Sequence, residues 1–314
     1  MALQIPRRTL RCFDTIRRCG SVRQAARQLH IDSSALNRQL IALEDALGMP
    51  LFERLPRGLQ LTPAGAAFAG HVLTVLQDEE RLESLIEALR GGRAGTVHLR
   101  SVEGLSAGLV ASVTAAMMRS HPGVRLRVQT GTSVANVEAV RNGDADLALS
   151  FAEVADADLE RRYGARFRLG AVLHPQHPLA GRMQLRFAEC AAHPLILSSP
   201  ELSIAAEMQP LLARHPGALD VVLETGSVEL ARSIAAAGLG IAFQTRLGLE
   251  QDLADGRLVF VPLQDEPPAE SPLSLFLRAG RSLQPALEAF ATRLAEAIAQ
   301  RAREELPRAQ LACA

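Results

Sequence analysis

Hydrophobic residues in the N-terminal part of the chain recur at helical spacing, and short polar breaks separate them. The pattern predicts a first helix from Pro6, a second that Ser21 caps, and a third that Asp32 or Ser33 caps and Gly48 ends. The third helix carries a row of leucines, Leu36, Leu40, Leu43 and Leu47. Because the leucines follow each other at helical spacing, we expect them to form one buried stripe.

Two short runs of strand-forming residues follow the third helix. They cover residues 51–54 and 59–61 and flank Pro56-Arg57-Gly58, which predicts a two-stranded hairpin with a basic tip. Helix, tight turn, helix and hairpin is the order of a winged helix-turn-helix. Such a domain places its last helix in the major groove of DNA.

The third helix also has a polar side. At about 100° per residue, Ser34, Arg38 and Ile41 fall opposite the leucines, and Asn37 lies on the flank. Arginine and asparagine can each make two hydrogen bonds to a base edge, and serine hydroxyls at a helix start suit phosphate oxygens. The alternative is that the serines only cap and the arginines are only solvated. The predicted DNA contacts are Ser33, Ser34, Asn37, Arg38, Gln39, Arg54 and Arg57.

A long helix is predicted next, over residues 63–90, because no further proline and no pair of glycines occurs between Pro63 and Gly91. A glycine-rich hinge follows, to residue 95. The apolar positions of this helix alternate spacings of four and three, with one interruption at Glu79: Phe68, Val72, Val75, Leu82, Ile86 and Leu89. So narrow a seam predicts a partner helix and therefore a homodimer. The alternative is packing against the same chain.

Strand patterns alternate with helix patterns from Thr96 onward, which predicts an α/β fold with mostly parallel strands. A terminal helix is predicted over 283–303. The predicted strands are 97–102, 124–129, 145–151, 167–173, 195–197, 221–224, 240–243, 258–261 and 273–278.

Composition and charge narrow the class of protein. The chain has 314 residues, of which 48% are hydrophobic, enough for two or three domains. It shows no apolar run of about 18 residues and no apolar signal core, so we expect a cytoplasmic protein without membrane contact. The formal charge is zero, but residues 1–43 hold eight arginines against two aspartates. Basic charge of this kind suits a DNA-binding end.

The sequence contains none of the common catalytic motifs that would indicate an enzyme. It lacks HExxH, GxSxG, a Walker loop and a GxGxxG after a strand. The four cysteines are scattered, without CxxC or Cys/His metal spacing. We therefore expect no catalytic residues, no cofactor and no metal. A pure solute-binding protein is the other rival, and the basic helical head argues against it.

The helix-turn-helix region resembles the LysR-type transcriptional regulator family. The match rests on Ala25–His30 and Ser34–Gln39, and it continues in register through Leu43–Gly48, Leu51–Arg54 and Leu61–Gly65. Weaker matches at Gly143–Ala148, His177–Ala180 and Gly238–Ala242 extend the resemblance to about residue 300. Two residues depart from the family pattern. Asn37 stands where many members have serine, and Gln244 stands where a proline often ends the strand.

The resemblance implies a domain plan. Residues 1–62 would bind DNA, 63–95 would form the linker helix and hinge, 96–302 would bind an effector, and 303–314 would be a tail. The effector domain would resemble a periplasmic binding protein, with subdomains 96–163 plus 270–302 and 164–269 around a cleft. The family implies homodimers, often assembled as homotetramers, that regulate transcription in response to a small molecule.

The effector is expected at strand ends and helix N-termini, where α/β folds bind their ligands. Hydroxyls and helix N–H groups that converge on a cleft favour a small organic anion such as a carboxylate. Glu103 would oppose an anion, and each hydroxyl has the alternative role of a helix cap. The predicted effector contacts are Ser101, Val102, Thr132, Ser133, Ser198, Ser199, Thr225, Ser227 and Phe243.

Overall fold

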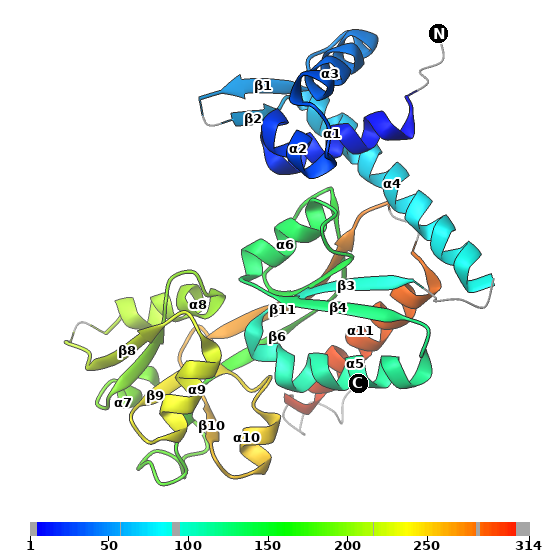
Figure 1. The fold of residues 1–314 in the computed structure, drawn as a ribbon. Helices are drawn as coiled ribbons and strands as arrows, with labels where there is room; N and C mark the ends of the chain where they lie inside the picture. The colour runs from blue at the N-terminus through cyan, green and yellow to red at the C-terminus, as the bar shows by residue number, and fades with distance from the viewer. Residues whose placement is uncertain (1–4, 57, 90–94, 216, 281–282, 306–314) are drawn as a thin grey trace. The chain divides into compact units, whose positions relative to one another are not determined.

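A computed structural model describes residues 5–56, 58–89, 95–215, 217–280 and 283–305. The chain divides into two compact units, Met1–Gly92 together with Gly280–Leu283, and Arg93–Ala279 together with Gln284–Ala314. Figure 1 shows the helical first unit and the mixed α/β second unit.

The first unit is a winged helix-turn-helix followed by a long helix, as the sequence predicts. Its elements are α1 Arg7–Cys19, α2 Val22–Leu29, α3 Ser33–Leu47, β1 Phe52–Leu55, β2 Gly58–Leu61 and α4 Pro63–Leu89. The strands β1 and β2 pair antiparallel as the wing.

Local signals fix the helix ends of this unit. The Asp32 carboxylate accepts hydrogen bonds from the backbone N–H groups of Ser34 and Ala35 at 2.8 and 3.2 Å, which caps α3. Gly48 ends α3 in the left-handed conformation at φ 70°. The turn between α2 and α3 is three residues long and passes through His30 at φ 54°, so α3 starts in a fixed direction.

The core of the first unit is built on α1. Leu36, Leu40 and Leu43 of α3 are buried there, which confirms the predicted stripe for these three leucines. Phe13 of α1 contacts Phe52 of the wing and Phe68 of α4, with ring centroids 5.2 and 4.8 Å apart. The hairpin and the start of α4 are therefore held against the same core.

The predicted seam of α4 is divided between two environments. Its first part, Phe68, Val72 and Val75, packs on the core of the same chain, which is the alternative to a partner helix. Glu79 forms an ion pair with Arg7 of α1 at 2.5 Å. Only beyond Glu79 is the seam exposed, at Leu82 and Ile86. The Leu89 side chain lies outside the described residues.

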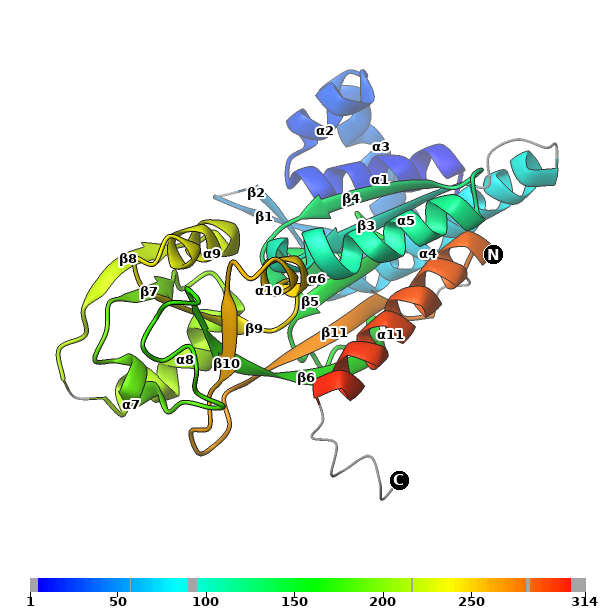
Figure 2. The ribbon, with the colours of Figure 1, turned by 90° about the horizontal axis from the view of Figure 1, so that it is seen from below.

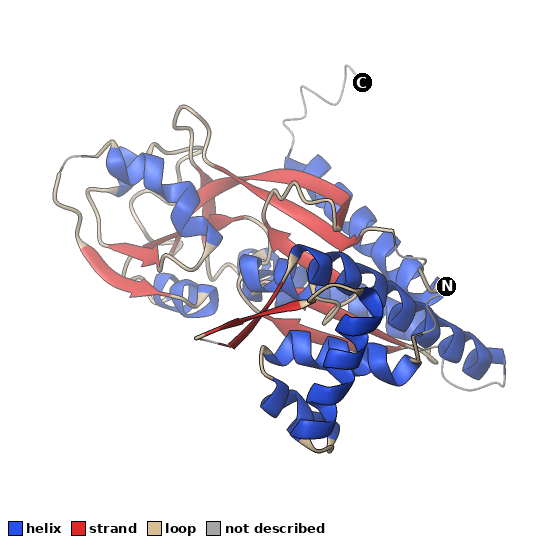
Figure 3. Ribbon diagram, turned by 90° about the horizontal axis from the view of Figure 1, so that it is seen from above, coloured by secondary structure: helices blue, strands red, loops and turns tan. Residues whose placement is uncertain are grey.

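The second unit is an α/β domain whose strands are covered by helices (Figure 3). Its strands are β3 Thr96–Ser101, β4 Arg125–Thr130, β5 Leu147–Phe151, β6 Leu159–Leu173, β7 Leu195–Ser198, β8 Val221–Thr225, β9 Ile241–Thr245, β10 Val259–Pro262 and β11 Glu270–Arg278. Its helical segments are η1 Glu103–Leu105, η2 Ser106–Val110, α5 Ala111–Ser120, α6 Ser133–Arg141, α7 Phe187–Cys190, α8 Ser203–Ala213, α9 Val228–Ala236, α10 Glu250–Ala254 and α11 Pro285–Glu305.

The expectation of mostly parallel strands is wrong. The strands run in the order β4-β3-β5-β11-β6-β9-β7-β8, with β10 also beside β6. Pairing is parallel for β3 with β4 and β5 and for β7 with β8 and β9. It is antiparallel wherever β6 or β11 takes part. The chain passes from the first parallel group of strands to the second along β6 and back along β11. Because the two strands run in opposite directions, they pair antiparallel.

The strands β6 and β11 join two lobes of the second unit (Figure 2). The first lobe holds β3, β4 and β5, and the second holds β7, β8, β9 and β10. The strand β6 continues through Tyr163 and Gly164, so the subdomain boundary implied by the resemblance falls inside a strand. The lobes are therefore connected by continuous β structure.

Two glycines of α4 give a matched test of this packing. A Cβ at Gly65 would overlap the Leu51 carbonyl oxygen, whereas a Cβ at Gly70 meets nothing within 4 Å. We expect Gly65→Ala to destabilise the first unit by about 1–3 kcal/mol. Gly70→Ala should stabilise it by about 0.5–1 kcal/mol, because glycine disfavours a helix interior. Urea unfolding followed by far-ultraviolet circular dichroism measures both, and equal effects would contradict the packing described.

Candidate functional site

One surface of the first unit combines the polar side of α3 with the wing. Ser34, Arg38 and Ile41 are exposed, opposite the buried leucines. Asn37 is half-buried on the flank. Within the first unit, this side of α3 is thus open to a partner.

A chain of hydrogen bonds orders this surface. The Ser34 hydroxyl donates to Asp32 at 2.5 Å and accepts from Arg38 Nη1 at 3.2 Å. The hydrogen bond from the Ser34 hydroxyl and those from the Ala35 and Ser34 backbone N–H groups lower the pKa of Asp32. On the flank, Arg54 Nη2 of the wing donates to Asn37 Oδ1 at 3.2 Å. Both arginines are held over α3 by side-chain contacts.

The remaining predicted DNA residues are placed differently. Ser33 is exposed at the first turn of α3. Gln39 is half-buried, and its amide oxygen accepts from the Cys12 thiol of α1 at 3.2 Å. Arg57 lies outside the described residues. The structure thus places Gln39 partly against the core, while Ser33 stays accessible.

Part of the basic charge of the first unit is neutralised internally. Asp14 is 6% exposed and accepts from Arg17 Nη2 at 2.8 Å and Arg18 Nε at 2.9 Å. The Arg17 side chain is itself buried in this pair. Counting arginines in the sequence therefore overstates the charge available to a partner.

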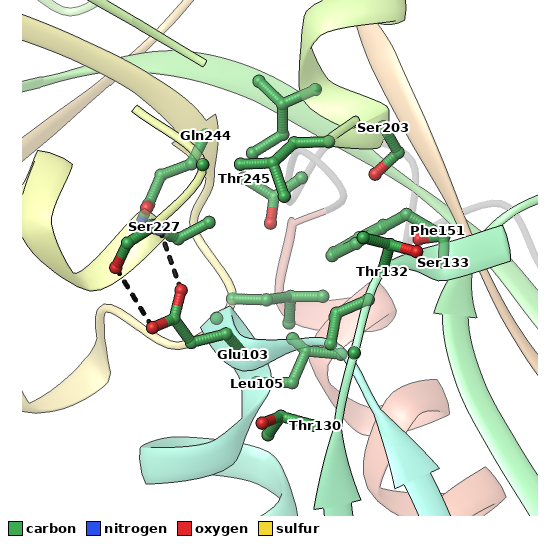
Figure 4. A pocket seen from close by; sticks show the side chains of 18 residues that line it. Glu103, Leu105, Thr130, Thr132, Ser133, Phe151, Ser203, Ser227, Gln244 and Thr245 are labelled. Carbon is green, nitrogen blue, oxygen red and sulfur yellow. Dashed lines mark hydrogen bonds between the residues drawn. The ribbon is translucent and has the colours of Figure 1, made fainter. Parts of the chain in front are cut away.

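A cavity of about 300 Å³ lies between the lobes of the second unit (Figure 4). Of the predicted effector residues, Val102, Thr132, Ser133 and Ser227 line it. They come from the end of β3, the start of α6 and the start of α9. Residues from distant parts of the sequence are brought together here, as expected for a ligand site at strand ends.

The N-terminus of α6 faces this cavity. Thr132 caps the helix, accepting from the Ala135 N–H at 3.3 Å. Ser133 is only 7% exposed, and its hydroxyl has no hydrogen-bond partner among the described residues. An unpaired hydroxyl at a helix N-terminus leaves a polar position for an acceptor to fill.

Two side chains fix the loop that leads into α6. Asn136 is fully buried and donates to the Gly131 carbonyl at 3.1 Å. Its amide oxygen accepts from Arg100 Nε at 3.2 Å, and Arg100 Nη1 donates to Gln129 at 3.3 Å. A Cβ at Gly131 would lie 2.7 Å from Arg100 Nη2. Arg100 thus places a positive charge behind the loop, next to the α6 terminus.

Across the cavity, Glu103 meets the N-terminus of α9 (Figure 4). Its carboxylate accepts from the Ser227 hydroxyl at 3.1 Å and from the Val228 N–H at 2.9 Å. Thr225 Oγ1 accepts from the Ser227 N–H at 3.1 Å and so supports this turn. Among the described residues that line the cavity, Glu103 alone carries a charged side chain.

Five predicted effector residues do not line this cavity: Ser101, Ser198, Ser199, Thr225 and Phe243. Ser101 is fully buried in β3. The Ser199 N–H donates to the Thr225 carbonyl at 3.0 Å. A separate cavity of about 120 Å³ is lined by Ser198 and Phe243. Effector contact from all nine residues stays a prediction.

Several residues that line the cavity were not predicted from the sequence. They come from strand ends, from the start of α8 and from the loop after β9: Thr130, Phe151, Ser203, Gln244, Thr245 and Leu247. Thr130, Phe151 and Thr245 are the last residues of β4, β5 and β9, so the strand-end rule itself pointed to them. Gln244, noted only as a departure from the family pattern, is buried against this space.

The described residues contain no group of three or more His, Cys, Asp or Glu side chains that could hold a metal ion. They also contain no helix that is long and apolar enough to cross a membrane.

Two family models match the chain. Residues 7–66 match the "Bacterial regulatory helix-turn-helix protein, lysR family", and residues 90–299 match the "LysR substrate binding domain". Together the two matches cover most of both units.

Curated relatives and solved structures agree with these matches. The "RuBisCO operon transcriptional regulator" of Allochromatium vinosum is 24% identical over 288 residues, 92% of this chain and 95% of that protein. An uncharacterised HTH-type transcriptional regulator of Mycobacterium bovis is 32% identical over 269 residues, 81% of this chain and 86% of that protein. Full-length OxyR from Pseudomonas aeruginosa shares the fold, with TM-score 0.66 at 19% identity, over 93% of this chain and 95% of that chain.

Proposed function

The chain belongs to the LysR family of transcriptional regulators, with a helix-turn-helix DNA-binding domain and an effector-binding domain. We propose that it binds DNA through the exposed side of α3 and binds a small organic acid, as its effector, at the N-terminus of α6. The observation that carries the DNA contact is the exposure of Ser34 and Arg38 opposite a buried leucine stripe.

The geometry of α3 supports contact with base edges in the major groove. Arg38 suits guanine and Asn37 suits adenine, because each can make paired hydrogen bonds to those bases. Ser33 and Ser34 lie at the helix start, where N–H groups and hydroxyls meet phosphate oxygens. Arg54 of the wing and the predicted contacts Arg57 and Gln39 complete the proposed interface.

Arg38→Ala should weaken binding to a duplex selected from a random pool with the wild-type protein. We expect a loss of about 1–3 kcal/mol at fixed salt, with relaxed base preference at one position of each half-site. Fluorescence anisotropy measures the affinity. Arg119→Ala, which changes an exposed arginine of the second unit, is the control and should bind normally. Wild-type affinity for Arg38→Ala would rule out the proposed contact.

LysR regulators form oligomers, and we propose that this chain dimerises through the exposed end of α4. Leu82 is 58% and Ile86 40% exposed, on the side of the helix that continues the seam. A partner helix would remove these apolar side chains from water. Dimerisation would also present two copies of α3 to two half-sites.

A Leu82→Glu, Ile86→Glu double variant should shift the protein from dimer toward monomer. Charged residues at seam positions remove the apolar contact and repel their counterparts. Sedimentation velocity gives the mass, and Asp78→Ala on the same helix serves as the control. An unchanged mass for the double variant would contradict dimerisation through α4.

The cleft supports a small acid as the effector. The unpaired Ser133 hydroxyl and the N–H groups of the first turn of α6 suit a carboxylate. Arg100 adds positive charge behind them. Leu105, Phe151 and Leu247 offer an apolar wall for the rest of the molecule. Binding would favour one arrangement of the lobes and so change how the dimer holds its two α3 helices, with coupling of about 1–3 kcal/mol.

Ser133→Ala should weaken the binding of monocarboxylic acids about tenfold, as expected for one lost charge-assisted hydrogen bond. The unliganded protein should keep its stability, because the hydroxyl has no partner to lose. Ser274→Ala is a matched control, since that hydroxyl is also buried and unpaired but does not line the cavity. Calorimetric titration with a panel of acids measures both. Equal affinity of the Ser133→Ala and wild-type proteins would contradict the site.

We further propose that the protein has no catalytic activity of its own and acts in the cytoplasm, where its DNA target lies. The family consists of regulators, and the sequence lacks the common catalytic motifs.

A further inference from the structure

We propose that Glu103 is a specificity-determining residue that makes the cleft select monocarboxylates and reject dicarboxylates. This inference rests on the proposed function, because it assumes that an acid binds at α6. Two helix N-termini from opposite lobes, those of α6 and α9, border the same cavity. The protein itself fills the second one with a carboxylate.

The contacts of Glu103 are those expected of a bound acid. One oxygen accepts from the Ser227 hydroxyl at 3.1 Å and the other from the Val228 N–H at 2.9 Å. The N–H group belongs to Val228, the first residue of α9, where the helix dipole favours a negative charge. Glu103 and Ser227 are 124 residues apart and belong to different lobes. Glu103 therefore acts as an internal ligand of α9.

Close backbone packing holds Glu103 at this place. A Cβ at Gly104 would lie 3.3 Å from Val228 Cγ1, and a Cβ at Gly248 would overlap the Gly104 carbonyl oxygen. Both glycines thus allow η1 to lie directly against the second lobe. Arg232 of α9, which is 7% exposed, donates to the Gly248 carbonyl and fixes that turn. The carboxylate is held by its backbone as well as by its own hydrogen bonds.

A second acidic side chain lies beside the turn that leads into α9, although it does not line the cavity. A Cβ at Gly226 would lie 2.5 Å from Glu201 Oε1, so the Glu201 carboxylate sits beside the residue that precedes Ser227. None of the described residues that line the cavity is an arginine, a lysine or a histidine. A ligand carboxylate at the α9 end would meet the negative charge of Glu103 without a cationic partner, which disfavours it.

The α6 end has the opposite character. Ser133 is buried with an unpaired hydroxyl, and Arg100 lies behind the loop. The cleft therefore accepts one acidic group of a ligand at the N-terminus of α6. The N-terminus of α9 is already occupied by the carboxylate of Glu103. A dicarboxylate could bridge the lobes only by displacing Glu103 from α9.

The first test compares matched acids on the full-length protein by calorimetry. The probes are hexanoate against adipate and pentanoate against glutarate. We expect the wild-type protein to bind each monoacid at least about tenfold more tightly than the matched diacid. Glu103→Ala should reverse this preference by opening the α9 terminus. Glu296→Ala, at an exposed glutamate of α11, should behave as wild type. A wild-type preference for diacids, or an unchanged preference in Glu103→Ala, overturns the proposal.

The second test needs no effector. Glu103→Ala should lower the melting temperature of the second unit by about 2–4 °C, the effect of one lost helix cap. Acetate should recover most of this loss, measured against chloride at equal ionic strength, because it can occupy the vacated position. The wild-type and Glu296→Ala proteins should gain less, because only the α6 position is open to acetate in them. Equal acetate effects on all three proteins overturn the proposal.

The two tests separate the two hypotheses. If no acid of the panel binds any variant, the proposed effector class fails, while the acetate experiment still decides whether Glu103 occupies an anion site. Glu103→Gln covers the case in which the alanine variant does not fold. It keeps an oxygen that accepts from Val228 but removes the charge, so adipate should gain affinity, by less than with alanine. No gain at all in Glu103→Gln counts against the proposal.

Discussion

The burial of Leu36, Leu40 and Leu43 against α1 is the constraint on which the DNA-binding function depends. Each buried leucine contributes about 2 kcal/mol, so turning α3 by half a revolution would expose three of them and bury Arg38. The helix thus has one stable orientation. That orientation leaves Ser34 and Arg38 in solvent, and the contacts from Asp32 and Arg54 hold this polar side in order before DNA arrives.

The effector site proposed for the second unit depends on helix termini rather than on an exposed helix face. Its cavity is lined mainly by apolar groups and hydroxyls, and helix termini supply most of the electrostatic character. The α6 end has an unpaired hydroxyl, while the α9 end is already occupied by a carboxylate of the chain. The two ends belong to different lobes, which β6 and β11 connect, so the proposed ligand would contact both lobes at once.

Features that depend on neighbouring residues were predictable from the sequence. Features that depend on which distant segments of the chain pair or pack together were not. Helical spacing and capping residues define α1 to α4 within a few positions, since these signals act over one or two turns. The antiparallel pairing of β6 and β11 escaped prediction, because periodicity does not reveal which strand returns beside which. For the cleft, Ser198 and Phe243 were chosen near strand ends, yet they line a different cavity. The partnership of Glu103 with Ser227 spans 124 residues and has no local signal.

DNA recognition as proposed requires the Ser34–Arg38 side of α3 to enter the major groove. A crystal structure of the full chain bound to a duplex selected from a random pool tests it most directly. We expect Arg38 and Asn37 within hydrogen-bond distance of base edges, with Ser33 and Ser34 at the phosphates. A complex in which this side of α3 faces solvent while another surface holds the duplex would contradict it.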